Sequence, residues 1–313
     1  MPIRIGSGLS FCGEEVKPEQ IELIRQITRD CRGLALTELA HTLCEVLGWQ
    51  RANGKLKSRE CYLFLLSLRE RGWLPWLPEP RPHARAPHQT HVDAESEPGA
   101  ACEGALPQWL PIGFQAVEGA AERKLFEQYI HRYHYLGYRV PYGAQLRYLV
   151  RAGKAPHPVL ACLLFTSAAR RMAPRDHWIG WNDITRRQGL AKVVNNSRFL
   201  ILPWVKIPNL ASHVLSRASE QLLGDWSSRY AVEPVLLETL VDSSRYRGTC
   251  YRAANWTRVG QTTGRGRMDR WREAPGECKE IFLYPLRKDW RVHLCGGPNG
   301  MPLHATSQPV GNL

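Results

Sequence analysis

The chain has 313 residues, of which 43% are hydrophobic, and carries a formal net charge of +13 with an isoelectric point of about 9.5. This apolar content suffices for a large core in one or two domains, and the excess of positive charge favours an anionic partner, most simply nucleic acid. The nine cysteines form no C-x-x-C pair, which argues against a zinc ribbon, and the lack of an apolar leader or bilayer-spanning run predicts a cytoplasmic protein with no membrane partner.

The N-terminal part of the chain predicts a helix-turn-helix domain of the winged-helix kind. Residues 18–31 and 37–49 place apolar side chains at helical spacing, and a third helix follows between Ser58 and Gly72. Thr37 and Ser58 are the expected N-caps, and Gly72 fits the C-terminal stop of the third helix. The sequence WLPWLP after this helix is a candidate wing strand.

Basic residues gather at the start of the third predicted helix. A recognition helix meets the phosphates and base edges of DNA at this end. The alternative is a three-helix protein-interaction module whose basic end is solvated. The candidate DNA contacts here are Lys55, Lys57 and Arg59.

Composition divides the chain into four parts. A segment after Pro78 is rich in proline, alanine, glycine and histidine and lacks apolar periodicity, which is typical of a disordered linker. The last residues of the chain are typical of a frayed terminus. The predicted parts are a helix-turn-helix domain at 1–78, a disordered linker at 79–106, a core domain at 107–292 and a flexible tail at 293–313.

The core domain alternates predicted helices and strands, which indicates a mixed α/β fold. Strands are predicted from short apolar runs, and helices from apolar positions at helical spacing. The predicted order is a helix at 122–137, strands at 144–153, 158–169 and 199–205, a helix at 209–226, a strand at 234–242, a short helix at 248–256 and strands at 257–264 and 280–286.

This order resembles the GNAT acyltransferase fold. The resemblance implies a central strand that enters a turn whose helix amides hold a pyrophosphate, with a second strand diverging from it. Here the turn is KIPNLAS, which contains Pro208 and no glycine. The backbone amides of Leu210, Ala211 and Ser212 are candidate anion donors, and no cofactor-binding residue is assigned. A CoA-dependent acyltransferase stays open as an alternative.

Several motifs also resemble the family of the Druantia anti-phage protein DruA. They are RYHYLGYRVPYGAQLRYLV, PRDHWIGWND, VVNNSRFLILPWVKIPNLASHVL, LLETLVD, GTCYRAANWTRVGQTTGRGR and IFLYPL, and they extend through nearly the whole chain. The resemblance implies a bacterial phage-defence or mobile-element context, with partner proteins encoded by that system. It implies no particular reaction or cofactor.

Polar residues interrupt the predicted core and mark a candidate site. Two asparagines and an arginine stand directly ahead of the strand at 199–205, either as a turn or as the wall of a polar cleft. Glu238 lies inside an otherwise apolar strand, where a carboxylate must be paired or functional. The GNAT-like order places the short helix at 248–256 beside the same cleft. The predicted site residues are His134, Asn195, Asn196, Arg198, Glu238, Tyr251 and Asn255.

Glu238 and Asp242 are four positions apart and therefore share one face of their strand. They form a candidate acid pair or, together with Asp183, a candidate set of Mg²⁺ ligands. The second interpretation predicts a metal-dependent DNA nicking or strand-transfer enzyme. A purely structural ion pair between Glu238 and either Arg198 or Arg245 is the alternative.

A basic, glycine-containing loop, TTGRGRMDRW, suits contact with phosphate backbones through Arg265, Arg267 and Arg270. We therefore predict a DNA-acting component of a bacterial phage-defence or mobile-element system. Three rival functions stay open: the metal-dependent nicking enzyme, the CoA-dependent acyltransferase, and a DNA-binding scaffold without enzymatic activity.

Overall fold

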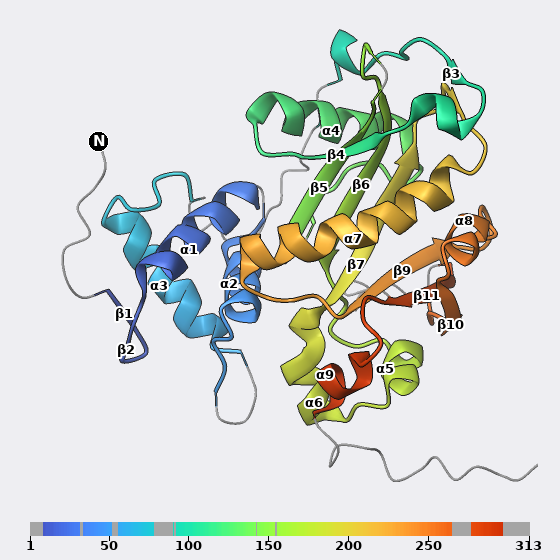
Figure 1. Ribbon diagram of the computed structural model, residues 1–313. Helices are drawn as coiled ribbons and strands as arrows, with labels where there is room; N and C mark the ends of the chain where they lie inside the picture. Colours follow the sequence, from blue (N-terminus) through green and yellow to red (C-terminus); the bar gives the residue numbers. More distant parts are fainter. Residues whose placement is uncertain are drawn as a thin grey trace, which may run out of the picture.

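The computed structural model describes residues 9–31, 34–51, 56–77, 90, 92–141, 143–153, 155–264 and 277–296. A small N-terminal group of helices packs beside a larger α/β core (Figure 1). The N-terminal elements are β1 (Ser10–Phe11), β2 (Glu14–Glu15), α1 (Pro18–Asp30), α2 (Leu36–Val46) and α3 (Ser58–Glu70). The three predicted helices are therefore present.

The N-terminal part differs from the predicted winged helix in its details. The N-caps of α2 and α3 are Ala35 and Lys57, so Thr37 and Ser58 lie inside their helices. Residues 73–77 form turns, and the candidate wing strand is not observed there. The eleven residues between α2 and α3 exceed the turn of three or four residues that joins a helix-turn-helix pair. The structure therefore does not establish a DNA-binding helix-turn-helix.

The core is built on a seven-stranded sheet with the strand order β10-β11-β9-β7-β6-β5-β4. Strands β7 and β9 are parallel, and all other neighbours are antiparallel. This arrangement confirms the predicted mixed α/β fold with a GNAT-like sheet. The strands are β4 (Ile112–Ala116), β5 (Gln145–Ala152), β6 (Val159–Ser167), β7 (Val193–Ile201), β9 (Leu236–Asp242), β10 (Thr257–Gln261) and β11 (Lys279–Pro285).

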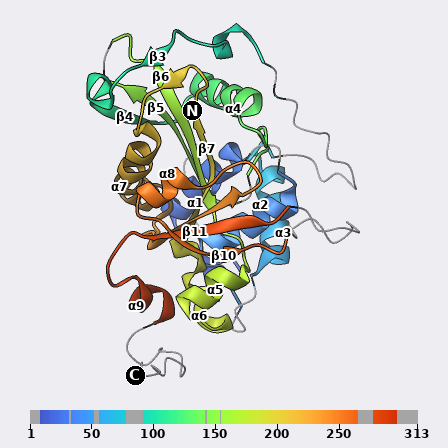
Figure 2. The same cartoon turned by 90° about the vertical axis from the view of Figure 1, so that its right-hand side faces the viewer.

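Helices cover both faces of this sheet. The long helix α7 and the helix α4 lie on opposite sides of it (Figure 2), and α5, α6 and α9 pack together at one end, where Trp178 stacks on Trp290 with ring centroids 4.4 Å apart. The α-helices are α4 (Ala120–Tyr133), α5 (Ala173–Ile179), α6 (Asp183–Gly189), α7 (Leu210–Tyr230), α8 (Thr249–Ala253) and α9 (Trp290–Cys295). Among the described helices, none combines the length and apolar composition needed to cross a membrane.

Two predicted flexible segments contribute to the fold. Within the segment expected to be a disordered linker, η1 (Ala94–Ser96) forms a short 3₁₀ turn and β3 (Cys102–Glu103) pairs with β8 (Val205–Lys206). A second 3₁₀ turn, η2 (Leu106–Trp109), begins at the last residue of this segment. The backbone carbonyl of Ser96 accepts a hydrogen bond of 2.8 Å from the Tyr133 hydroxyl. Residues 92–106 therefore pack on the surface of the core, because they pair and form hydrogen bonds with it despite their turn-rich composition.

The predicted tail boundary at residue 292 also differs from the structure. Helix α9 continues to Cys295, and Leu294 is buried in the second apolar cluster with Trp181 and Trp290. A third 3₁₀ turn, η3 (Leu190–Lys192), leads into β7 and stands beside this cluster. The core therefore extends three residues beyond the predicted boundary.

The N-terminal helices share buried contacts with the core. The Gly143 amide donates to the Thr42 hydroxyl at 3.2 Å, and the Gln145 side chain donates to the Cys31 thiol at 3.2 Å. Cys31, Thr42 and Gln145 are each at most 3% exposed, and burial raises the pKa of the Cys31 thiol to about 11. The two parts therefore form one continuous interior rather than two separate ones.

Strand β7 begins earlier than the sequence indicates, and this changes the position of its polar residues. Asn195, Asn196 and Arg198 lie within the strand, not ahead of it. Strands β7 and β9 pair only from Val193 to Asn196 and then separate. A β-bulge at Ser197 interrupts the pairing of β7 with β6. The polar residues are therefore in the middle of the sheet, where the two parallel strands part.

Candidate functional site

The bulge at Ser197 assigns the polar residues of β7 to opposite faces of the sheet. Side chains alternate along a strand, and one extra residue reverses the alternation that follows. Arg198 consequently shares a face with Asn195, as their β6 partners Leu164 and Thr166 do. Asn196 points to the other face. The predicted single site is thus divided between the two sides of the sheet.

On the face beneath α7 and α8, Asn196 and Tyr251 form a closed hydrogen-bond network. The Tyr251 hydroxyl donates to Asn196 Oδ1 at 2.8 Å, and the Asn196 amide group donates to the Arg198 backbone carbonyl at 3.2 Å. Thr239 on β9 donates to the Asn196 backbone carbonyl at 2.9 Å. Asn196 is 2% and Tyr251 7% exposed. These groups satisfy one another and hold β7 and α8 together.

Asn255 does not join this network. It is exposed and adopts a left-handed conformation with a φ of 63° directly after α8. Asparagine tolerates this conformation better than most residues. Its position is explained by the turn from α8 into β10.

On the opposite face, Glu238 forms a buried ion pair. Arg175 from α5 donates to Glu238 Oε2 at 2.9 Å, and both side chains are 0% exposed. The second oxygen, Oε1, accepts the Ala169 backbone amide at 3.2 Å. Neither of the two predicted partners, Arg198 and Arg245, forms an ion pair with Glu238. Glu238 is a paired carboxylate whose position depends on α5.

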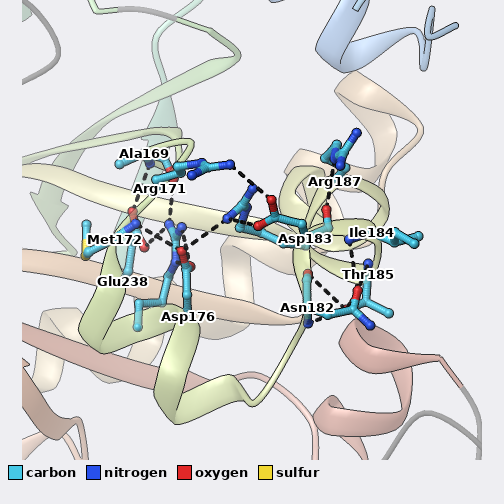
Figure 3. Close-up of polar contacts among 12 residues, drawn as sticks. Ala169, Arg171, Met172, Asp176, Asn182, Asp183, Ile184, Thr185, Arg187 and Glu238 are labelled. Carbon is cyan, nitrogen blue, oxygen red and sulfur yellow. Dashed lines mark hydrogen bonds and ion pairs between the residues drawn. The ribbon is translucent and has the colours of Figure 1, made fainter. Parts of the chain in front are cut away.

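The ion pair continues into an alternating network of charges along α5 and α6 (Figure 3). Arg175 also bonds Asp176 at 2.7 Å, and Arg186 lies 3.8 Å from Asp176 and 3.0 Å from Asp183. Asp183 is 56% exposed and forms a further pair with Arg171 at 3.1 Å. The network anchors the segment after β6 to the centre of the sheet.

The three candidate metal ligands are not brought together. Arg175, Asp176 and Arg186 separate Asp183 from Glu238, and Asp242 instead accepts two hydrogen bonds from Ser244, at 2.6 Å from its hydroxyl and 3.1 Å from its amide. The first of these bonds lowers the pKa of Asp242. Among the described residues, no group of three metal-ligating side chains occurs. The predicted Mg²⁺ set is therefore not supported by this geometry.

On the same face, three nitrogen-bearing side chains form a cluster, here called the cationic cluster: Arg198 on β7, Lys279 on β11 opposite Asp242, and His134 at the end of α4. Arg198 donates only to backbone carbonyls, at 3.4 Å to Gly137 and 2.7 Å to Ser197. Within the described ranges, neither Arg198 nor Lys279 has a carboxylate within ion-pair distance. Burial lowers the pKa of both groups. For Lys279 the charge of Arg198 adds to the effect, while the charges of Asp242 and Glu277 oppose it.

His134 is held in a defined orientation within this cluster. Its Nδ1 atom accepts the Leu136 amide at 3.2 Å, which leaves the neutral ring with its proton on Nε2 as a donor. Burial, together with the positive charges of Arg198 and Lys279, lowers the pKa of His134 to about 4. At neutral pH the cluster therefore offers two cations and one neutral donor.

Asn195 adds an unsatisfied acceptor on the same face. Its Oδ1 atom is buried and has no hydrogen-bond partner in the described part of the chain. Buried polar atoms of this kind are rare in folded proteins and require an explanation.

The predicted nucleic-acid contacts are only partly described. Lys55, Arg265, Arg267 and Arg270 lie outside the described residues. Lys57 places its ammonium group 5.8 Å from the Phe11 ring centroid, and Arg59 is exposed on α3. These two residues are available at the surface of the N-terminal part.

The chain matches one protein family and a set of solved structures. The family model described as Druantia protein DruA matches residues 78–274, which is more than half of the chain. The chain belongs to the DruA family. No curated protein matches its sequence.

Solved structures similar to this DruA-family chain are acetyltransferases. The spermidine/spermine N-acetyltransferase SpeG from Vibrio cholerae, with manganese ions, is 10% identical over 56% of this chain and 92% of its own, with a TM-score of 0.36. The spermidine N-acetyltransferase from Vibrio cholerae with CoA and spermine is 8% identical over 56% and 95%, with a TM-score of 0.37. These scores carry no inference about ligands.

A surface groove of about 590 Å³ lies at the start of α7, between Lys206, Asn209, Ser212 and Cys250. The GNAT-like order implies acyl-CoA, and the groove has room for a phosphate group near the first amides of α7. Tyr251, which follows the lining residue Cys250, packs its ring 5.1 Å from Trp256 and 5.9 Å from Phe282. The CoA-dependent acyltransferase stays a prediction.

Sequence reasoning missed Arg175, Lys279 and Tyr246. Arg175 stands in the quoted motif PRDHWIGWND, where a buried arginine has no distinctive pattern. In the sequence, Lys279 stands at the start of an apolar run and resembles the solvent-exposed end of a strand. Its position opposite Asp242 depends on pairing between strands that are 36 or more residues apart, which only the fold provides.

The titration of His134 tests the electrostatics of this face in the DruA-family protein. We expect its ring protons to titrate near pH 4 in the folded protein and near pH 6.5 in denaturant, as an unperturbed histidine does. Because the folded-state pKa is depressed, the unfolded chain binds the extra proton. The contribution of neutral His134 to stability is therefore present above pH 6.5 and decreases as the pH falls toward 4.

Nuclear magnetic resonance of the ring protons measures this directly, with His134→Phe identifying the signal. The same variant should weaken the dependence of stability on pH between 4 and 6.5. A folded-state pKa at or above 6.5 would contradict the described environment of His134.

Proposed function

We propose that this protein is a nucleic-acid-acting component of a bacterial phage-defence system, and that its cationic cluster contacts nucleic-acid phosphates. Membership of the DruA family supports the defence role. The net charge of +13 supports an anionic partner. Partner proteins encoded by the same system are part of this proposal.

The observation that carries the proposal is Arg198. Its partly buried guanidinium donates to two backbone carbonyls and pairs with no carboxylate of the described residues, and buried charge of this kind costs stability unless an anion binds. The fully buried Arg175 is instead paired with Glu238. Charge that lacks a partner in the folded protein is a feature of functional sites.

The positions of Lys279 and His134 strengthen the case for a phosphate. Both are close enough to Arg198 for their electrostatic interaction with it to change a pKa. A phosphate oxygen accepts charge-assisted hydrogen bonds from arginine and lysine, and a neutral Nε2–H donates a further one. The three donors come from β7, β11 and α4, so the folded core positions them before any ligand binds.

Binding of a labelled DNA oligonucleotide to the full chain tests the proposal. We expect binding that weakens steeply with salt and that Arg198→Gln reduces roughly tenfold or more, the effect of losing one charge-assisted bond. Arg217→Gln is the matched control, because Arg217 is 57% exposed on α7 and pairs with Glu220 at 2.7 Å. Equal affinity of the Arg198 variant and the control would refute the assigned site.

A further inference from the structure

We infer that the cationic cluster binds an unpaired nucleotide of single-stranded nucleic acid, with the phosphate at Arg198 and Lys279 and the base against Tyr246. This inference rests on the proposed function and names its substrate class. The observation that supports it is a group of aromatic side chains next to the cationic cluster.

The aromatic group consists of Tyr135, Tyr246 and the ring of His134. Tyr135 lies 4.9 Å from the His134 ring at an angle of 28°, and 5.5 Å from the Tyr246 ring at 57°. The Arg245 guanidinium is 5.3 Å from the Tyr135 ring centroid. Tyr246 is 52% exposed. A large ring supported on one side and open on the other is a stacking surface.

His134 joins this aromatic group to the cationic cluster. Its ring stacks on Tyr135, and its pKa responds to Arg198 and Lys279. The backbone also fixes Tyr246 nearby, because its amide donates to the Asp242 carbonyl at 2.9 Å and Asp242 pairs with Lys279 across the sheet. A phosphate at the cations and a base on Tyr246 therefore belong to adjoining parts of one surface.

The nearby carboxylate does not prevent phosphate binding. Asp242 is 2% exposed and accepts both Ser244 bonds on one oxygen, while its other oxygen lies 3.6 Å from the Arg245 side chain. Its charge still acts on Lys279, as does the charge of Glu277. Arg198 is therefore the main phosphate donor, since it forms no ion pair with a described carboxylate, and Glu238 is already paired with Arg175.

A stacking surface of this kind selects unpaired bases. In a duplex both faces of each base are covered by neighbouring pairs, whereas unpaired bases stack on tyrosine rings and arginine planes. Duplex contact would leave this ring unused.

The test compares a labelled 12-nucleotide single strand with a duplex of the same sequence, using the full chain at moderate salt. We expect the single strand to bind at least tenfold more tightly. Tyr246→Ala should weaken single-strand binding by roughly fivefold to a hundredfold, the effect of losing one stacked base, and should change duplex binding little. Tyr246→Phe keeps the ring and should bind as the unsubstituted protein does, and Arg217→Gln serves as the surface control.

The outcomes separate this inference from the proposed function. Equal affinity for the two nucleic acids, with no effect of Tyr246→Ala, would overturn the inference and leave a phosphate-binding protein. Absence of binding to both would overturn the inference and the proposed function together. Because Tyr246 is exposed, its variants should fold normally, which a thermal melt confirms.

Discussion

Replacing Arg175 by methionine is expected to lower the free energy of unfolding by about 3–5 kcal/mol, because it leaves the Glu238 carboxylate buried without a cation. Glu238 would keep only the Ala169 amide as a partner. Glu238→Gln should cost less, about 3 kcal/mol, because Arg175 retains Asp176 at 2.7 Å and the Ala169 carbonyl at 2.7 Å. Arg175→Met should therefore cost more than Glu238→Gln, because it leaves the Glu238 carboxylate without a cation, whereas Arg175 keeps other partners when Glu238 is replaced.

Denaturant unfolding of both variants and of Arg175→Met combined with Glu238→Leu measures these energies. The double variant removes both buried charges and should be more stable than Arg175→Met alone. Asp183→Asn is the control at the exposed end of the same network, where ion pairs contribute at most about 1 kcal/mol. Full stability of Arg175→Met would show that Glu238 is compensated by another group.

Removal of residues 1–77 is expected to leave a core that no longer unfolds cooperatively. The sequence alone predicts a separable domain at 1–78, but α1 and α2 cover Gln145, which is 1% exposed. Truncation would uncover Gln145, remove the Thr42 hydroxyl from the Gly143 amide and expose the apolar residues packed beside them. The effect should be far larger than that of any single substitution at this interface.

Thermal unfolding with near-ultraviolet circular dichroism distinguishes a packed core from a loosened one. Thr42→Val in the full chain is the control, since it removes one hydrogen bond and should cost only about 1–3 kcal/mol. A truncated protein with a sharp transition within a few degrees of the full chain would show that the two parts are independent domains.

The sequence predicted helices and strands well wherever the pattern of apolar residues determines them. The runs that became β5, β6 and β9 were continuous and were predicted within two residues of their observed bounds at most ends. Helices α5 and α6 escaped prediction because each has only seven residues, and Arg175 is buried through ion pairing rather than apolar character. The starting point of β7 was wrong because two asparagines normally indicate a turn.

The sequence could name candidate site residues but not their arrangement. His134, Arg198 and Glu238 do lie on one face, yet Asn196 and Tyr251 lie on the other because of the bulge at Ser197. A bulge depends on how two strands fit together, and a single sequence contains no direct sign of it. The same reason explains why Lys279 and Tyr246 were not foreseen.

The salt dependence of single-stranded DNA binding by Arg198→Gln combined with Lys279→Gln tests the central claim most directly. The slope of log affinity against log salt counts the phosphates that the protein neutralises. The account predicts that the double variant binds more weakly and that the magnitude of this slope falls by about one to two, while Arg217→Gln leaves it unchanged. An unchanged slope in the double variant, with nucleic acid still bound, would place the phosphates elsewhere on the protein and contradict the account.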